Sequence, residues 1–176
     1  MLTWDNFALK EMNIRNVTLD DAATICNIYN HYIENTAVTF ETVPISEIEM
    51  RKRIEEVINT GYSFYVGETN GKIIGYCYTH RWSNRYAYET TVEESIYLDK
   101  NETGKGYGAQ LFKHMLNNLD KSKTHVLIGG ICIPNEGSVR LHEKFGFTKI
   151  SHMKEIGRKF YQWRDVGHWQ LIFEGN

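Results

Sequence analysis

Apolar residues recur at helical intervals near the start of the chain. An irregular extension over residues 1–11 precedes a first strand over residues 12–17. Thr18 and Asp21 form a capping-box-like pair, and apolar side chains three and four positions apart follow them, so we expect a helix here. The apolar positions of this helix are Ala22, Ile25, Ile28, Tyr29, Tyr32 and Ile33.

A second helix is expected after the turn-like stretch that ends at Pro44. Ser46 and Glu49 form another capping box, and Gly61 is a typical residue at which a helix ends. The pattern therefore predicts a helix from residue 46 to about residue 60. Two helices thus stand between the first strand and the rest of the sheet.

The period of the pattern then changes to that of strands. Residues 62–68 and 72–80 are strand-like, and Thr69-Asn70-Gly71 between them is typical of a hairpin turn. A third strand over residues 91–98 ends at a loop over residues 99–104. These segments predict three consecutive strands in the middle of the chain.

The last part of the sequence alternates between helix and strand. The strand over residues 125–133 is continuously apolar, which suits the centre of a sheet that is covered on both sides. A short helix begins at Pro134-Asn135 and ends near Phe145-Gly146, and strands over about residues 147–156 and 165–173 follow it. The order β-α-α-β-β-β-α-β-α-β-β predicts an α/β fold with a mixed sheet. The helix before residue 125 has one apolar face, formed by Gly108, Leu111, Phe112, Met115, Leu116 and Leu119.

Length and composition fit a single globular domain over residues 12–174. The 176 residues are 41% hydrophobic with only two prolines, which favours an ordered core. The net charge of −2 and the scattered Lys and Arg residues give no basic patch, so no nucleic-acid partner is expected. The three cysteines lack zinc or disulfide spacing, and no segment resembles a signal peptide or a membrane span. We expect a cytoplasmic protein without a metal and without membrane contact.

A glycine-rich turn lies between a predicted strand and a predicted helix. Glycines let backbone N–H groups approach a ligand, and the helix N-terminus that follows favours an anion such as a pyrophosphate. A sharp strand-to-helix turn without any ligand explains the same residues. Two familiar nucleotide motifs fail, because Gly106 follows Lys105 where a Walker loop has Ser or Thr, and the dinucleotide fingerprint needs another glycine spacing. The turn consists of Gly104, Lys105, Gly106, Tyr107 and Gly108.

Asn135 and His142 are two candidates on the short helix near the C-terminus. They lie seven residues apart, close to two helical turns, so both side chains can line the same face. Asn135 is also well placed to cap the helix, and a lone helical histidine is more often a surface or satisfied core residue. Taken alone, neither residue decides between a structural and a functional role.

The combination of motifs is more specific than any one of them. The strand Ser95-Ile96-Tyr97-Leu98, the glycine turn and the segment from Asn135 to Phe147 together resemble the acetyl-CoA-binding core of the GNAT acetyltransferase superfamily. More narrowly, the chain resembles the phosphinothricin and methionine-sulfoximine N-acetyltransferases over about residues 13–173. The further segments that carry this resemblance are Ile28-Tyr29-Asn30, Thr39-Phe40-Glu41, Arg85–Tyr88, Thr91–Tyr97, Ser138–His142, Lys159, Trp163–Val166 and Trp169-Gln170.

The resemblance implies a mixed, mostly antiparallel sheet flanked by helices, with acetyl-CoA as cosubstrate. A bulge in the strand before the glycine turn is expected to separate two strands and to open a slot for the thioester. Thr103 stands where many superfamily members have Arg or Gln just before the turn, and Glu102 adds a negative charge beside the expected pyrophosphate. The implied cofactor-binding residues are Ile96, Tyr97, Leu98, Gly104, Lys105, Gly106, Tyr107, Gly108, Ala109 and Asn135.

The resemblance also implies catalytic and substrate-binding residues. Glu93 corresponds to the proposed general base, whose pKa burial or the adjacent Glu94 should raise, and His142 to a group that acts as acid or second base. The substrate is then a small amino-acid-like molecule, and the enzyme is expected to be a homodimer. The implied substrate-binding residues are Ser83, Asn84, Arg85, Glu93, Glu94 and Ser95.

Other functions remain open on the sequence alone. The first is acetylation of another amine, such as a polyamine or a protein N-terminus, although a polyamine site should be lined by acids rather than by Arg85. The second is a non-catalytic acyl-CoA-binding or regulatory domain, against which the retention of both Glu93 and His142 argues. A nucleotide-binding module is disfavoured because both glycine fingerprints fail.

Overall fold

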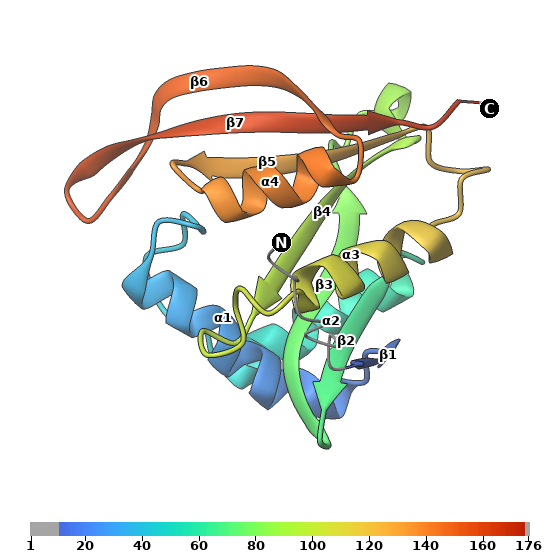
Figure 1. Cartoon of the computed structure of the whole chain (residues 1–176), viewed down its shortest axis with the longest axis vertical. Helices are drawn as coiled ribbons and strands as arrows, with labels where there is room; N and C mark the ends of the chain where they lie inside the picture. The colour runs from blue at the N-terminus through green and yellow to red at the C-terminus, as the bar shows by residue number, and fades with distance from the viewer. Residues whose placement is uncertain (1–10, 175–176) are drawn as a thin grey trace, which may run out of the picture.

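The computed structural model describes residues 11–174, which form one seven-stranded sheet with helices on both faces (Figure 1). Ten of the eleven residues of the expected extension, residues 1–10, lie outside the described part. The strands are β1 (Asn13–Asn16), β2 (Phe64–Thr69), β3 (Lys72–Arg81), β4 (Thr91–Leu98), β5 (Val126–Ile133), β6 (Thr148–Lys159) and β7 (Gln162–Ile172). The helices are α1 (Ala22–Asn35), α2 (Glu47–Asn59), α3 (Tyr107–Asn118) and α4 (Glu136–Lys144), with short 3₁₀ turns η1 (Leu19–Asp21) and η2 (Tyr86–Tyr88).

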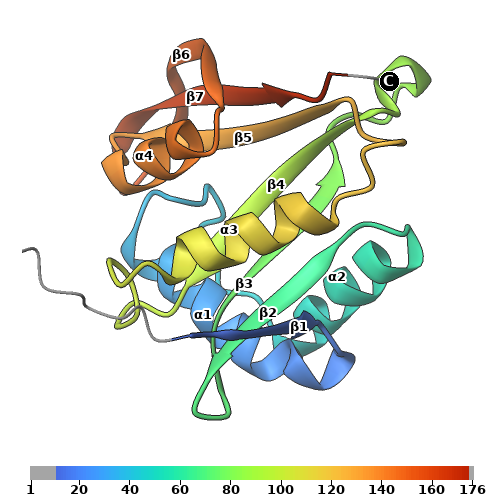
Figure 2. The same cartoon turned by 45° about the vertical axis from the view of Figure 1, so that its right-hand side comes forward.

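The sheet order is β1-β2-β3-β4-β5-β7-β6, and among the strands of residues 11–174 only the pair β4–β5 is parallel. Helices α1 and α2 pack on one face over a core that includes Ile25, Ile33 and Ile54. Helices α3 and α4 pack on the other face, over a second core that includes Phe112 and Trp169. Figure 2 shows α3 in front of the central strands and α1 and α2 behind them. The predicted mixed, mostly antiparallel α/β architecture is confirmed.

The helix starts follow the predicted caps. The Ser46 hydroxyl accepts a hydrogen bond of 3.1 Å from the Glu49 amide, which satisfies one free N–H group at the start of α2. The Asp21 carboxylate accepts from the Thr18 amide at 2.8 Å, but the first turn there is 3₁₀ and α1 begins only at Ala22. Among the described residues, no helix is long and apolar enough to cross a membrane.

The last two strands are longer than predicted. They meet at a tight turn in which Phe160 and Tyr161 have φ angles of 53° and 62°. Such turns usually carry Asn and Gly, because these residues tolerate positive φ with little strain. Two aromatic residues therefore give no turn signal, and residues 157–159 and 162–164 were not predicted as strand.

Strands β4 and β5 pair only over their first half. The pairing runs from Thr91 opposite Val126 to Glu94 opposite Gly129, although both strands continue for four more residues. Figure 2 shows the two strands close together at one end and apart at the other. The expected slot between the strands is thus present. The expected bulge is not seen in the pairing of β4 with β3, which keeps one register throughout, so β4 and β5 separate by divergence alone.

Candidate active site

A small cavity of about 50 Å³ lies where β4 and β5 diverge. Among its lining residues are Ile96 and Tyr97, which were predicted to bind the cofactor, and Ser95, which was predicted to bind substrate. Leu98 does not line it; its carbonyl accepts a 2.7 Å hydrogen bond from the Tyr32 hydroxyl. The complete lining is Val38, Glu94, Ser95, Ile96, Tyr97, Gly130, Ile131, Cys132, Asn135, Ser138 and His142.

The glycine turn leads directly into α3. Gly104 and Gly106 have φ angles of 74° and 82°, which explains glycine at both positions. The side chain of Tyr107 is buried in the core, so only its backbone can meet a ligand. The first N–H groups of α3, including those of Gly108 and Ala109, have no acceptor within the helix and form a site suited to an anion.

The charge of Glu102 beside this turn is balanced within the chain. Lys105 Nζ donates a 3.1 Å hydrogen bond to the Glu102 carboxylate. The negative charge of Glu102 is therefore paired. Lys105 lies at the turn as predicted, but it is engaged with Glu102.

Asn135 caps a helix and also lies beside the diverging strands. Its side-chain oxygen caps α4 by accepting a 3.2 Å hydrogen bond from the Ser138 amide. The same residue lines the small cavity between β4 and β5. Its capping role is thus seen directly, and its position still places it beside the slot.

His142 and Glu94 form a buried pair at the point where the strands separate. His142 Nδ1 donates to the Ser138 carbonyl at 2.8 Å, and its Nε2 lies 2.5 Å from Glu94 Oε1. Both side chains are at most 3% exposed. Burial lowers the pKa of His142, but the hydrogen bond and charge of Glu94, with the Ser138 carbonyl, outweigh it and raise the pKa overall. A Cβ on Gly129 would clash with both side chains, which explains glycine there.

The contact between His142 and Glu94 bears on two roles predicted from the sequence, that of His142 in acid–base catalysis and that of Glu94 in substrate binding. Both ring nitrogens of His142 have partners, Nδ1 at the Ser138 carbonyl and Nε2 at Glu94, while the ring also lines the small cavity. The Glu94 carboxylate lies on the α4 side of the sheet and is not among the residues that line the large cavity described below. The structure thus brings these two predicted site residues together, as one buried contact between β4 and α4.

Glu93 lies on the opposite face of β4, because adjacent residues of a strand point to opposite sides. Its side chain is 27% exposed, and its Oε2 is 3.7 Å from His80 Nε2 on β3. Burial raises the pKa of Glu93; the charge of His80 lowers it and that of Glu94 raises it, with a net increase. The pKa therefore moves in the direction expected for a general base at neutral pH.

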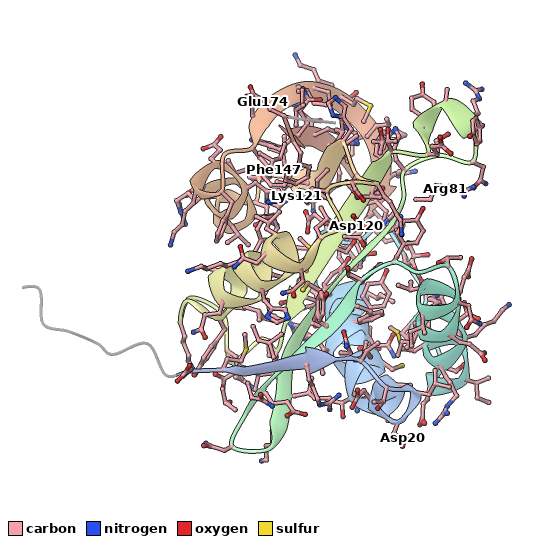
Figure 3. The ribbon with its side chains drawn as sticks, turned by 90° about the vertical axis from the view of Figure 1, so that its right-hand side faces the viewer. Asp20, Arg81, Asp120, Lys121, Phe147 and Glu174 are labelled. Carbon is pink, nitrogen blue, oxygen red and sulfur yellow. The ribbon has the colours of Figure 1, made fainter. Side chains whose placement is uncertain are left out.

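A cavity of about 650 Å³ adjoins Glu93 through His80. Asn84, a predicted substrate-binding residue, lines this cavity. Arg81 also lines it but was not predicted as a site residue; Figure 3 labels it at the end of β3. Ser83 and Arg85 do not line it and belong to the neighbouring loop before η2. The lining is formed by Tyr29, Met50, Arg53, Glu56, Val57, Thr60, Tyr62, Phe64, Tyr76, Tyr78, His80, Arg81 and Asn84.

The walls of this cavity are held rigidly from both sides. Arg53 of α2 donates to Glu41 at 2.6 Å and to Glu49 at 2.9 Å, so its guanidinium is fixed at the wall. The rings of Phe64 and Tyr78 stack with centroids 5.0 Å apart. Period-two alternation along β3 already places Tyr76, Tyr78 and His80 on one face, and this signal could have identified them from the sequence. In residues 11–174, no cluster of His, Cys, Asp and Glu side chains is arranged to hold a metal ion.

The chain matches a known protein family over most of its length. Residues 14–168 match the family described as Acetyltransferase (GNAT) domain. The chain is 35% identical to a phosphinothricin N-acetyltransferase of Streptomyces viridochromogenes, over 94% of this chain and 90% of that protein. It is 32% identical to an L-methionine sulfoximine/L-methionine sulfone acetyltransferase of Salmonella typhimurium, over 91% and 94% of the two chains.

Solved structures agree with the sequence comparison. A putative acetyltransferase from Salmonella typhimurium, solved with its cofactor acetyl-CoA, superposes with a TM-score of 0.91 at 31% identity, covering 95% of this chain and 96% of that one. A phosphinothricin acetyltransferase from Sinorhizobium meliloti in complex with acetyl-CoA gives a TM-score of 0.89 at 31% identity, covering 92% and 88%. This chain is therefore a member of the GNAT acetyltransferase family.

Proposed function

We propose that this protein transfers the acetyl group of acetyl-CoA to the amino group of a small amino acid of the phosphinothricin, methionine sulfoximine or methionine sulfone type. The observation that carries the proposal is the position of Glu93 beside both the diverging strands and the large cavity. Relatives named for these substrates cover nearly the whole chain, which supports the substrate class.

Acetyl-CoA is the acetyl donor of this family, and three parts of the chain suit it. The N–H groups of residues 104–109 would hold the pyrophosphate at the start of α3. The backbone of Ile96 and Tyr97 would pair with the pantetheine arm in the slot, with Asn135 on its other side. The thioester supplies the activated acetyl group, and the chain positions it.

Glu93 would act as the general base. An α-ammonium group is mostly protonated at neutral pH, so one proton must leave before the nitrogen lone pair can attack the thioester carbonyl. The carboxylate of Glu93 would take that proton, and burial makes it a stronger base than an exposed carboxylate. The amine would reach it from the large cavity.

The acidic group of the substrate would bind in that cavity beside the end of β3. Asn84 and Arg81 line the cavity there, with Ser83 and Arg85 in the loop that follows β3. A guanidinium group can bind a carboxylate or phosphinate with two parallel hydrogen bonds. We propose this segment as the substrate-binding loop.

A substrate panel tests the proposed function. Thiol release from acetyl-CoA would be measured with phosphinothricin, methionine sulfoximine, methionine sulfone, ordinary amino acids and polyamines. We expect rapid turnover with the first three, because they combine an α-amino group with a second polar group suited to the loop that follows β3. Turnover confined to polyamines, or no turnover with any amine despite acetyl-CoA binding, would contradict the proposal.

We further propose that the enzyme is a homodimer. The β6–β7 hairpin exposes several large apolar side chains, among them Tyr161 at 92% and Trp163 at 60% exposure. A second copy of the chain would cover such a patch. Sedimentation should give twice the mass of the chain, and Trp163→Ser combined with Tyr161→Ser should shift the molecule toward the monomer. A monomer at all concentrations of the unmodified protein would contradict the proposal.

A further inference from the structure

A row of polar side chains crosses the sheet on the face that carries the large cavity. His80 of β3 is the cross-strand partner of Glu93 in β4, and Gly130 of β5 is the partner of His168 in β7. A Cβ on Gly130 would lie 3.0 Å from Glu93 Oε1 and 3.8 Å from the His168 ring. Glu93 therefore stands between two histidines, with bare backbone at Gly130 beside it.

The two histidines differ in their surroundings. The Nδ1 of His168 is 2.7 Å from the Ser151 hydroxyl, and burial lowers the pKa of this imidazole, which favours its neutral form. The side chain of His80, in contrast, is 36% exposed and lines the large cavity. Of the two, His80 is the histidine that can exchange a proton with water in the cavity.

The hydrogen bond of His80 fixes the direction of its free lone pair. Its Nδ1 lies 3.1 Å from the Arg81 carbonyl, and because a carbonyl can only accept, Nδ1 carries a proton. In the neutral ring, Nε2 is then the unprotonated nitrogen, and it is the atom that lies 3.7 Å from Glu93 Oε2. His80 thus points a proton acceptor at the proposed general base.

We propose that His80 acts through Glu93, by accepting the proton that the Glu93 carboxylate removes from the substrate amine and releasing it into the cavity. The inference deepens the proposed function and rests on it. Imidazole in water is a stronger base than a carboxylate, and this difference gives the direction of the transfer from Glu93 to His80. The Glu93 carboxylate is then ionised again and can accept a proton from the next substrate amine.

The proton balance of this step is simple. An N–H bond of the substrate ammonium breaks, its electron pair stays on nitrogen, and the proton passes to a carboxylate oxygen of Glu93. The O–H bond then breaks as an N–H bond forms at His80 Nε2, giving an imidazolium. This imidazolium returns one proton to water, and nothing is oxidised or reduced.

Other charged and titratable groups surround this pair and share its pH dependence. From β5 only the backbone of Gly130 contributes. The groups that face Glu93 and His80, or that shift the pKa of Glu93 or of the adjacent Tyr78, are Tyr78 on β3, Glu94 on β4, His168 on β7, Arg53 on α2 and Glu41 from the segment between α1 and α2.

His80→Gln tests the inference, because glutamine can hydrogen-bond but cannot be protonated at neutral pH. The measurement is kcat and kcat/KM for the amino substrate between about pH 5 and pH 9, which spans the titration of imidazole. We expect kcat to fall about tenfold or more, as for loss of part of an acid–base pathway. The acid limb of the kcat/KM profile should also move to lower pH, because the variant no longer needs a neutral imidazole at position 80 to take the proton from Glu93. His125→Gln, an exposed histidine beside β5, serves as the matched control and should leave both unchanged.

The outcomes separate this inference from the proposed function. If the acid limb of His80→Gln stays in place, or kcat stays within about twofold of the unmodified enzyme, His80 is not the proton acceptor. Loss of activity in Glu93→Gln in the same assay would then leave the general base standing and overturn only the role of His80. Full activity of Glu93→Gln would overturn both.

Discussion

Glu93→Gln should lower kcat by about 10²-fold or more, the usual contribution of a general base. Glutamine keeps the size and the hydrogen-bonding capacity of the side chain but cannot take a proton from the amine. Because Glu93 lies on the face opposite the His142–Glu94 pair and does not line the slot, acetyl-CoA should bind nearly as before. Steady-state turnover and calorimetric titration with acetyl-CoA measure the two effects separately.

The control for this substitution is Glu34→Gln, which removes an exposed carboxylate on α1 far along the chain from the site. It should leave turnover unchanged. If Glu93→Gln retains activity within about threefold, the general-base role is wrong, because acid–base catalysis is worth far more. A large loss of acetyl-CoA affinity would instead assign Glu93 to the shape of the slot.

The architecture was predictable because local signals agree with the global fold. Helix α2 begins where Ser46 and Glu49 predict it, and the continuous apolar run of β5 forms an interior strand of the sheet. The turn Asn70-Gly71 joins β2 to β3 with positive φ at both residues. Capping, periodicity and turn chemistry act over a few residues, so a sequence reveals them directly.

The arrangement of the site was harder to predict, because it depends on contacts between distant segments. Glu94 and His142 are 48 positions apart, and only the packing of α4 over Gly129 brings them together. Strand alternation alone places Glu93 and Glu94 on opposite faces, so their different roles had a sequence signal. The neighbour of Glu93 across the sheet, His80, depends on the β3–β4 register.

Glu94→Ala should destabilise the protein by about 3 kcal/mol or more, because it leaves a buried imidazole without its partner. His142 is 1% exposed, and Glu94 is the partner of its Nε2. Glu94→Gln should cost less, since its amide can still donate to a neutral imidazole. Urea unfolding monitored by circular dichroism measures the free energy of unfolding of each variant.

The pH dependence of this loss identifies its cause. The pKa of His142 is raised in the folded protein, so its contribution to stability is fully present below its pKa in the unfolded chain, about 6.5. That contribution disappears as the pH rises through the folded pKa. The cost of Glu94→Ala should therefore be largest in mild acid and shrink in alkali. A cost that is the same at all pH values would mean that lost packing, rather than the ion pair, is responsible.

A double substitution separates the pair from its surroundings. The His142 ring packs 5.2 Å from the rings of Phe112 and Phe147, so phenylalanine at position 142 would join an aromatic cluster. Replacing a buried ion pair by apolar residues of similar volume is often neutral or stabilising. We therefore expect His142→Phe combined with Glu94→Leu to be more stable than Glu94→Ala and independent of pH in this range. A double variant as unstable as Glu94→Ala would contradict this expectation and show that apolar packing does not replace the buried pair.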